Sequence, residues 1–213
     1  MKKRVFILVI LLLAASCFAL RTSAAQEDAE DASGLLLAVM PEEGADEWSF
    51  LFVSADPVED KLMCTQIPAD QAVSIRVYNG HFLSRGLTMG NVCTLGYAWE
   101  EDAGAIGIST AAVQTSFQLS PAYTLLLSAE DADRIFRQAL SELHIIKISP
   151  DNGLAFKRAV VGLQGLDASA QSSFAEFVAA HSVSDADENT ISTYLSEMIS
   201  SSSGCKMVTL QPA

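Results

Sequence analysis

The chain has 213 residues, half of them hydrophobic, and its 26 acidic side chains outnumber 13 basic ones, giving a net charge of −13. A negative field of this strength repels nucleic acid and anionic lipid, so the composition argues against partners of either kind. The length and the apolar fraction favour one domain with a sizeable core.

The first 25 residues predict a secretory signal peptide. Residues 2–4 are basic, residues 5–15 form an apolar run, and residues 23–25 are small, which is the order that a signal peptidase substrate requires. The run is well short of the roughly 20 residues that cross a bilayer, so we expect no stable membrane span after cleavage. The mature protein is then periplasmic or secreted and begins near Gln26, while lipid attachment at Cys17 is the alternative.

Residues 26–33 contain Glu, Asp, Ala and Ser without an apolar period. Such a segment buries too little surface to offset its ordering entropy, so we predict a disordered acidic lead-in. A single β-rich domain with a helical C-terminal part is expected over residues 34–213.

Short apolar runs separated by turn residues predict a series of strands as far as residue 128. This spacing is typical of an antiparallel β-sandwich or barrel-like core rather than of alternating strands and helices. The predicted strands are residues 35–40, 48–53, 62–67, 73–78, 92–99, 105–109, 113–119 and 123–127.

One hairpin is predicted from its turn residues. Asn79 and Gly80 favour the positive φ angles of a two-residue type I′ turn, and residues 73–78 alternate between apolar and polar side chains. We therefore expect residues 73–78 to pair antiparallel with residues 81–85.

The hydrophobic period changes after residue 128. Ser128 and Asp131 predict a helix start, and apolar residues then follow one helical face over residues 129–143. Further helices are predicted to begin near Asp167 and at Asp185–Glu188, with a hairpin over residues 144–161 before them. Residues 206–213 would add an edge strand or fray. The predicted fold class is therefore α+β, mainly β, with two to three C-terminal helices.

Three cysteines remain after the predicted cleavage, which in an oxidising compartment suggests one disulfide and one spare thiol. We predict a bridge between Cys64 and Cys93, because both fall in predicted strands and share a face with apolar residues. Cys205 follows a serine-rich stretch and would be the spare thiol. Pairing of Cys205 with either strand cysteine stays open, since spacing alone does not fix connectivity.

No residue pattern in the chain predicts a catalytic, metal or cofactor site. The sequence contains no glycine-flanked serine elbow and no metal-ligand spacing of cysteines or histidines. His81, His144 and His181 are interpreted as solvated or packed side chains. Gly104 and Gly107 are too sparse for a phosphate-binding loop.

The acidic run after Trp99 gives one candidate for sugar chemistry. Glu100, Glu101 and Asp102 could line a cleft beside an aromatic platform. Glycosidic cleavage needs two carboxylates in different environments, whereas adjacent loop residues share one environment, so we interpret this run as solvated.

A combination of short motifs resembles a known family of exported proteins. These motifs are Trp48 on an early strand, cysteines on strands, Asp133, Phe136 and Leu140 on a helix, and the apolar-Gly-apolar segment 161–166 before Ala168 and Ala170. In this respect the chain is similar to the small exported proteins of the invasion-associated locus B family, although the family's cysteine soon after the tryptophan is displaced to Cys64. The resemblance implies a non-enzymatic, β-rich periplasmic or surface protein associated with host-cell interaction.

Two classes of function follow from these observations. The first is a non-enzymatic exported protein that binds an unknown protein or envelope partner. The alternative is a secreted hydrolase whose site is assembled from scattered residues. A deep pocket that holds a histidine and carboxylates would favour the hydrolase, whereas a shallow surface with an apolar patch would favour the binding protein.

Overall fold

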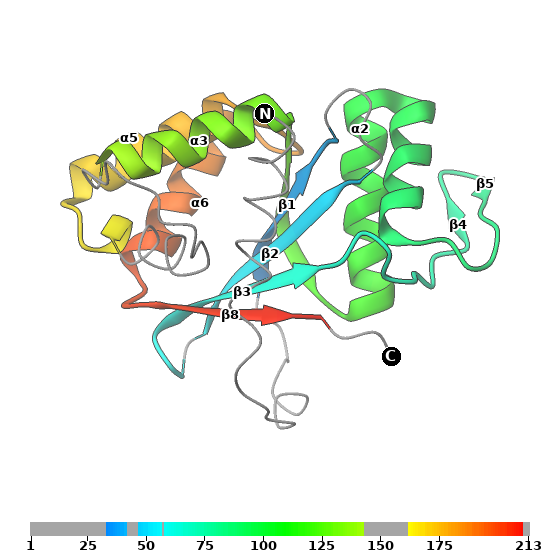
Figure 1. Cartoon of the computed structure of the whole chain (residues 1–213), viewed down its shortest axis with the longest axis horizontal. Coiled ribbons are helices and arrows are strands. Elements are labelled where there is room, and N and C mark those ends of the chain that lie inside the picture. The colour runs from blue at the N-terminus through cyan, green and yellow to red at the C-terminus, as the bar shows by residue number, and fades with distance from the viewer. Residues whose placement is uncertain (1–32, 42–46, 57, 143–161, 211–213) are drawn as a thin grey trace, which may run out of the picture.

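The computed structural model describes residues 33–41, 47–56, 58–142 and 162–210 (Figure 1). Its elements are β1 (Ser33–Val39), β2 (Ser49–Asp56), β3 (Lys61–Ile67), β4 (Val77–Tyr78), β5 (His81–Phe82), α2 (Met89–Phe117), β6 (Ser120–Leu127), α3 (Ala129–Glu142), α5 (Ala168–Ala180), β7 (Val183–Ser184), α6 (Glu188–Ser200) and β8 (Cys205–Thr209).

Within the described ranges, six strands form one mixed sheet in the order β7-β6-β1-β2-β3-β8. β2 pairs antiparallel with both β1 and β3, and β6 pairs antiparallel with β7. β1 and β6 are parallel, as are β3 and β8. Strand β8 therefore lies at one edge of the sheet, beside β3.

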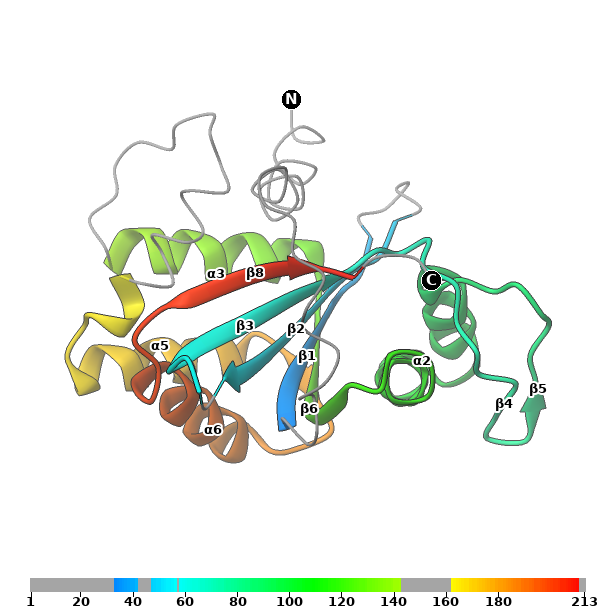
Figure 2. The same ribbon diagram turned by 90° about the horizontal axis from the view of Figure 1, so that it is seen from below.

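Helices cover both faces of this sheet, with α2 on one face and α3, α5 and α6 on the other (Figures 1 and 2). Successive side chains of a strand point to opposite faces. Phe50 and Phe52 of β2 accordingly join the core under α2, whereas Leu51 and Val53 join the core under α5 and α6. The sheet separates two hydrophobic cores.

Helix α2 consists of two helical segments joined by a sharp bend. Glu100 and Glu101 interrupt the helix, and Glu101 has a φ of 52°. Gly96 and Gly104 lie against each other, and a Cβ added to either would clash with the other's carbonyl oxygen. The two glycines thus allow the backbones of the segments to approach closely.

The predicted β-sandwich or barrel-like core is wrong, because the sheet is mixed and open and lies between helices. The main error concerns residues 92–99, 105–109 and 113–119, which were predicted as strands and form most of α2. Short apolar runs fit a buried helix as well as a buried strand. The start of α2 carries the signal that decides between them, a capping box of Thr88 and Asn91.

The predictions for the other elements are closer to the structure. Asn79 and Gly80 have φ angles of 46° and 81°, and Val77 pairs with Phe82, so the turn is confirmed, although each strand has only two residues. The Ser128 hydroxyl accepts the Asp131 amide hydrogen at 3.0 Å, which confirms the predicted start of α3.

Helices α5 and α6 match the last two predicted helices, and their caps are Asp167 and Asp187. Strand β8 confirms the edge-strand alternative for the tail. The predicted signal peptide, nearly all of the lead-in and the hairpin over residues 144–161 lie outside the described residues. In the described part of the chain, no helix combines the length and the apolarity that a membrane crossing needs.

Candidate ligand-binding cavity

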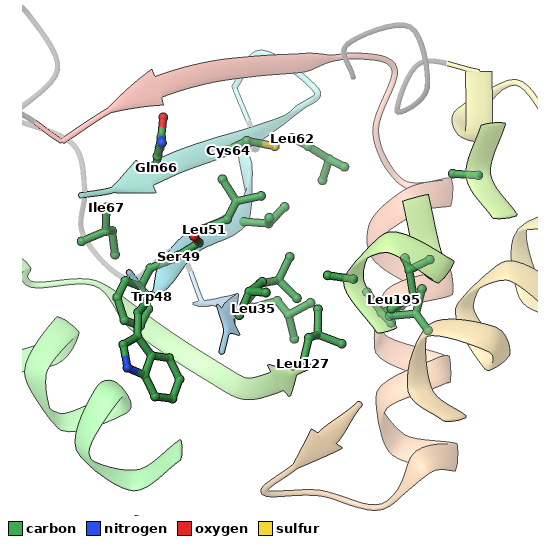
Figure 3. A pocket seen from close by; sticks show the side chains of 18 of the residues that line it. Leu35, Trp48, Ser49, Leu51, Leu62, Cys64, Gln66, Ile67, Leu127 and Leu195 are labelled. Atoms are coloured by element: carbon green, nitrogen blue, oxygen red, sulfur yellow. The ribbon is translucent and has the colours of Figure 1, made fainter. Parts of the chain in front are cut away.

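A cavity of about 510 Å³ lies on the face of the sheet that α3, α5 and α6 cover (Figure 3). Strands β1, β2 and β3 form one wall with apolar side chains that include Leu35, Leu51 and Leu62. Helices α5 and α6 contribute Phe174 and Leu195. Its size falls within the ~300–1,000 Å³ of small-molecule sites.

Helix α3 contributes two alanines and an isoleucine to the lining of the cavity, namely Ala132, Ala139 and Ile135. Close-packed interiors leave few voids larger than a water molecule, and larger residues at the two alanine positions would fill this space. The size of the space therefore depends in part on the local sequence of α3.

The polar lining is concentrated at one end of the cavity. Glu47, Ser49, Gln66 and Asp70 belong to the start of β2, the end of β3 and the segments beside them. Figure 3 shows Gln66 and Ser49 at the opposite side from Leu195. Among the described lining residues the charged side chains are carboxylates and none is basic.

Two polar atoms of this end are buried without a hydrogen-bond partner among the described residues. They are the Ser49 hydroxyl oxygen and the Gln66 carboxamide oxygen Oε1. Buried polar groups in folded proteins are nearly always hydrogen-bonded. This unsatisfied pair distinguishes the polar end from the rest of the lining.

Trp48 lines the cavity next to Ser49, and its side chain contacts α2. Its indole Nε1 donates a hydrogen bond to the Thr94 hydroxyl at 2.9 Å, and its ring stacks on Phe50 with centroids 6.1 Å apart. The tryptophan that the sequence singled out thus connects the cavity wall to α2.

His81 and His181, the two histidines in the described part of the chain, do not line the cavity. His81 stacks on Trp99 with centroids 4.2 Å apart. His181 follows α5, forms a hydrogen bond through Nδ1 to the Phe177 carbonyl oxygen at 2.8 Å, and stacks on the Phe177 ring. His144 lies outside the described residues.

The carboxylates after Trp99 lie at the bend of α2, away from the cavity. Asn79 Nδ2 donates to a Glu100 carboxylate oxygen at 3.3 Å, which connects the β4–β5 turn to the bend. His81 stacks on one face of the Trp99 ring, so that face is not open to a sugar. In the part of the chain that the structure describes, no group of three His, Cys, Asp or Glu side chains could hold a metal ion.

The structure does not bring Cys64 and Cys93 together. Cys64 belongs to the core on the cavity side of the sheet, and Cys93 to the core under α2. Cys64 instead lies beside Cys205, with 3.4 Å between the two sulfur atoms. The hydrogen bond with Cys205, together with burial, raises the pKa of the Cys64 thiol. Burial alone raises the pKa of the Cys93 thiol.

No family model and no curated protein matches the sequence. The fold is similar to several solved structures. A protein from Streptococcus agalactiae superposes with a TM-score of 0.55 at 12% identity, over 84% of this chain and 77% of that one. A transcriptional regulator from Enterococcus faecalis gives a TM-score of 0.54 at 12% identity, over 88% and 79%.

TagV from B. subtilis gives a TM-score of 0.51 at 13% identity, over 84% of this chain and 83% of that one. Identities this low show a shared fold alone. The resemblance to the invasion-associated locus B family stays a prediction, because these similarities do not bear on it.

The sequence interpretation missed the cavity because its walls come from residues far apart in the chain. Two local signals were present. Small residues recur on the buried face of α3 at Ala132 and Ala139, and polar residues occupy Ser49 and Gln66, where the strand alternation favours apolar ones.

Proposed function

We propose that this is a non-enzymatic exported binding protein that encloses the apolar part of an elongated amphiphilic molecule in the cavity beneath α3. The observation that carries the proposal is the apolar cavity of about 510 Å³ between the sheet and the helices. Transfer of an alkyl chain from water into such a space is favourable by about 0.8 kcal/mol for each methylene group.

The compartment in this proposal rests on residues 1–25, whose basic start, short apolar run and small residues have the order of a cleaved signal. A role in DNA binding, which the name of the Enterococcus faecalis protein suggests, is not favoured, because the net charge of this chain is −13. The hydrolase alternative gains no support from His81 and His181, because neither lines the cavity.

The test is displacement of the fluorescent apolar probe N-phenyl-1-naphthylamine by alkanols from octanol to hexadecanol. The expected affinity rises about fourfold for each added methylene until the chain outgrows the cavity. An affinity that does not depend on chain length contradicts the proposal.

A variant that fills the cavity tests whether the probe binds in this place. Ala132→Phe inserts a ring into the space beneath α3 and should abolish displacement. Ala132→Ser at the same position leaves the space open and should retain binding. Thermal melts of both variants check that they remain folded. Full binding by a folded Ala132→Phe protein would place the probe elsewhere.

A further inference from the structure

The hairpin of β4 and β5 presents a pair of apolar side chains to solvent. Val77 lies directly opposite Phe82 in this hairpin, and the two side chains are 52% and 89% exposed. Figures 1 and 2 show the hairpin beside α2 and away from the six-stranded sheet. Its residues do not line the cavity. The apolar pair therefore belongs to a surface that is separate from the proposed ligand site.

The opposite face of the hairpin packs on α2. Tyr78 and His81 form the neighbouring pair, and they point to that face because successive side chains of a strand alternate. His81 stacks on Trp99, and the Tyr78 hydroxyl lies against Gly107, where an added Cβ would clash with it. These contacts fix the hairpin on α2 without using the apolar pair, so packing does not explain why that pair is apolar.

Two arginines at the base of the hairpin carry charges that the described structure does not neutralise. In the described part of the chain, ion pairs are formed by the other basic side chains, Lys61, Arg134, Arg137 and Lys206. Arg76 and Arg85 are exposed, and neither forms an ion pair with a described residue. The Arg76 guanidinium lies 3.5 Å from the carbonyl oxygen of Ser84, the residue before Arg85, so the two arginines lie at the same end of the hairpin.

The combination of an exposed aromatic ring with unpaired arginines indicates the chemistry of a partner. Aromatic residues and arginine are enriched in protein interfaces and among the residues that dominate binding. A large apolar side chain of the partner would remove the Phe82 ring from water, and carboxylates would pair with the two guanidinium groups. The surface therefore fits a partner that is both apolar and acidic.

The carboxylates at the bend of α2 favour a narrow partner over an anionic membrane. Glu100 accepts a hydrogen bond from Asn79 at the turn of the hairpin, and two further acidic residues follow it. A bilayer surface would meet these carboxylates and the rest of a chain whose net charge is −13. The arginines lie at the other end of the hairpin, so one peptide segment can reach them while carboxylates beyond about 8 Å are screened.

We propose that the hairpin of β4 and β5 is a docking surface for an apolar, acidic segment of a partner protein. Phe82 contacts an apolar side chain of this segment, and Arg76 and Arg85 pair with its carboxylates. The inference goes beyond the proposed function, because it assigns a different class of partner to a different place on the molecule.

The experiment selects binding peptides from a phage-displayed library of random dodecapeptides. The protein is purified after expression of the full-length sequence and immobilised, and the library is first depleted on the Phe82→Ser variant. Enriched peptides should combine a large apolar residue with at least two carboxylates, one for each arginine. Enrichment of basic peptides, or no enrichment beyond that on the Phe82→Ser variant, overturns the inference.

Affinity is then measured by fluorescence anisotropy with a labelled synthetic copy of the most enriched peptide. Phe82→Ser should weaken binding about tenfold or more, and Arg76→Gln and Arg85→Gln should weaken it roughly threefold each. Binding should also weaken as the NaCl concentration rises, because exposed ion pairs are screened. Binding that does not depend on the two arginines overturns the inference.

Val58→Ser and Arg134→Gln are the matched controls. Val58 is 91% exposed and Arg134 is an exposed arginine, and both lie outside the hairpin. Both controls should bind the peptide as the wild type does, and a loss of binding in either one contradicts the assignment to the hairpin. The Tm of Phe82→Ser should stay close to that of the wild type, because the ring is exposed. A large fall in Tm would show a structural role for Phe82 and overturn the inference.

Two further measurements separate this surface from the cavity and from a membrane anchor. Ala132→Phe fills the cavity and should leave peptide binding unchanged, so this inference and the proposed function can fail independently. Vesicles of phosphatidylglycerol should not sediment with the protein. Sedimentation with these vesicles that is lost in Phe82→Ser overturns the inference, because the partner of the hairpin would then be a lipid surface.

Discussion

Cys93 shows how one buried side chain makes stability depend on pH. Its thiol is fully buried under α2, and burial raises its pKa above the ordinary value of 9.0. In the folded protein the thiol keeps its proton at a pH where the unfolded chain has lost it. Unfolding therefore releases a proton above about pH 9, and the free energy of unfolding falls as the pH rises further.

We expect a slope of about 1.4 kcal/mol per pH unit from this group above its unfolded pKa, and none below it. Urea melts of wild-type and Cys93→Ala proteins from neutral to alkaline pH provide the measurement. The alanine variant is less stable at neutral pH because of the cavity it leaves, but its stability should decline less steeply with pH. Parallel pH profiles would show that Cys93 does not titrate in this way.

Gly80 affects stability through the backbone conformation of its turn. Its φ of 81° and the φ of 46° at Asn79 lie in the region that β-branched residues avoid. Gly80→Val should therefore lower the free energy of unfolding by about 1 kcal/mol or more, read from the midpoint of a urea melt. Asn79→Gly is the control and should be tolerated, while an unchanged midpoint for Gly80→Val would rule out strain at this turn.

Single residues also mark the limits of what the sequence could predict. Asn79 and Gly80 favour positive φ angles whatever surrounds them, so these two residues were enough to predict the turn. Ser49 and Gln66 break the apolar alternation of their strands, but that break does not reveal a cavity, because the cavity forms only when α3, α5 and α6 pack over the sheet. The functional meaning of a polar residue is visible only when its missing partners are known.

At the level of elements, the two segments of α2 depend on contact between glycines. A Cβ at Gly104 would overlap the carbonyl of Gly96, which is backbone and cannot rotate away. Gly104→Ala should destabilise the protein by about 1–3 kcal/mol, measured by thermal or urea unfolding. At Gly204 an added Cβ would make an ordinary contact, 3.5 Å from Lys61 Cγ, so Gly204→Ala is the control and should have a small effect.

The cysteines test the pairing of β3 with β8. The sulfur atoms of Cys64 and Cys205 are 3.4 Å apart on neighbouring parallel strands, whereas Cys93 lies across the sheet. After oxidation by a small-molecule disulfide, we expect peptide mapping to recover Cys64 linked to Cys205. The cross-link would close a loop of 141 residues, which the chain-entropy model values at about 5 kcal/mol.

Cys93→Ser should leave this cross-link intact, whereas Cys64→Ser should abolish it. Recovery of Cys64 linked to Cys93 would support the original sequence prediction and contradict this arrangement of the sheet.

The elements differ in how much of them the sequence could predict. Helices α3, α5 and α6 begin at capping residues that the sequence shows. Helix α6 also has a single buried stripe of Ile191, Leu195, Met198 and Ile199, so its helical period could be predicted. Helix α2 has a separate buried stripe in each of its two segments, Met89, Val92, Cys93 and Gly96 in the first and Ala105, Ile108, Ser109 and Ala112 in the second. Glycine and serine occupy part of these stripes, so the apolar pattern does not mark them. The sandwich prediction failed at α2, and the mixed sheet could not be derived without it.

For the whole molecule, export is the prediction with the simplest readout. Secretion by the route that residues 1–25 suggest should leave a mature N-terminus near Gln26 in the periplasm or the medium. Edman sequencing of the secreted protein tests this cleavage. A blocked N-terminus on a lipid-modified Cys17 would show a lipoprotein instead.

The position of β8 has a consequence for how the protein assembles during synthesis. The strand pairs with β3, and the two cysteines in these strands are 141 residues apart. Contacts between such distant segments form slowly, because a long loop must close first. Until the last residues have been made, one edge of β3 has no neighbour and can recruit the same strand from another molecule. A chain that stops before Cys205 should therefore aggregate as it is synthesised, and early termination would produce inclusion bodies rather than a smaller working domain.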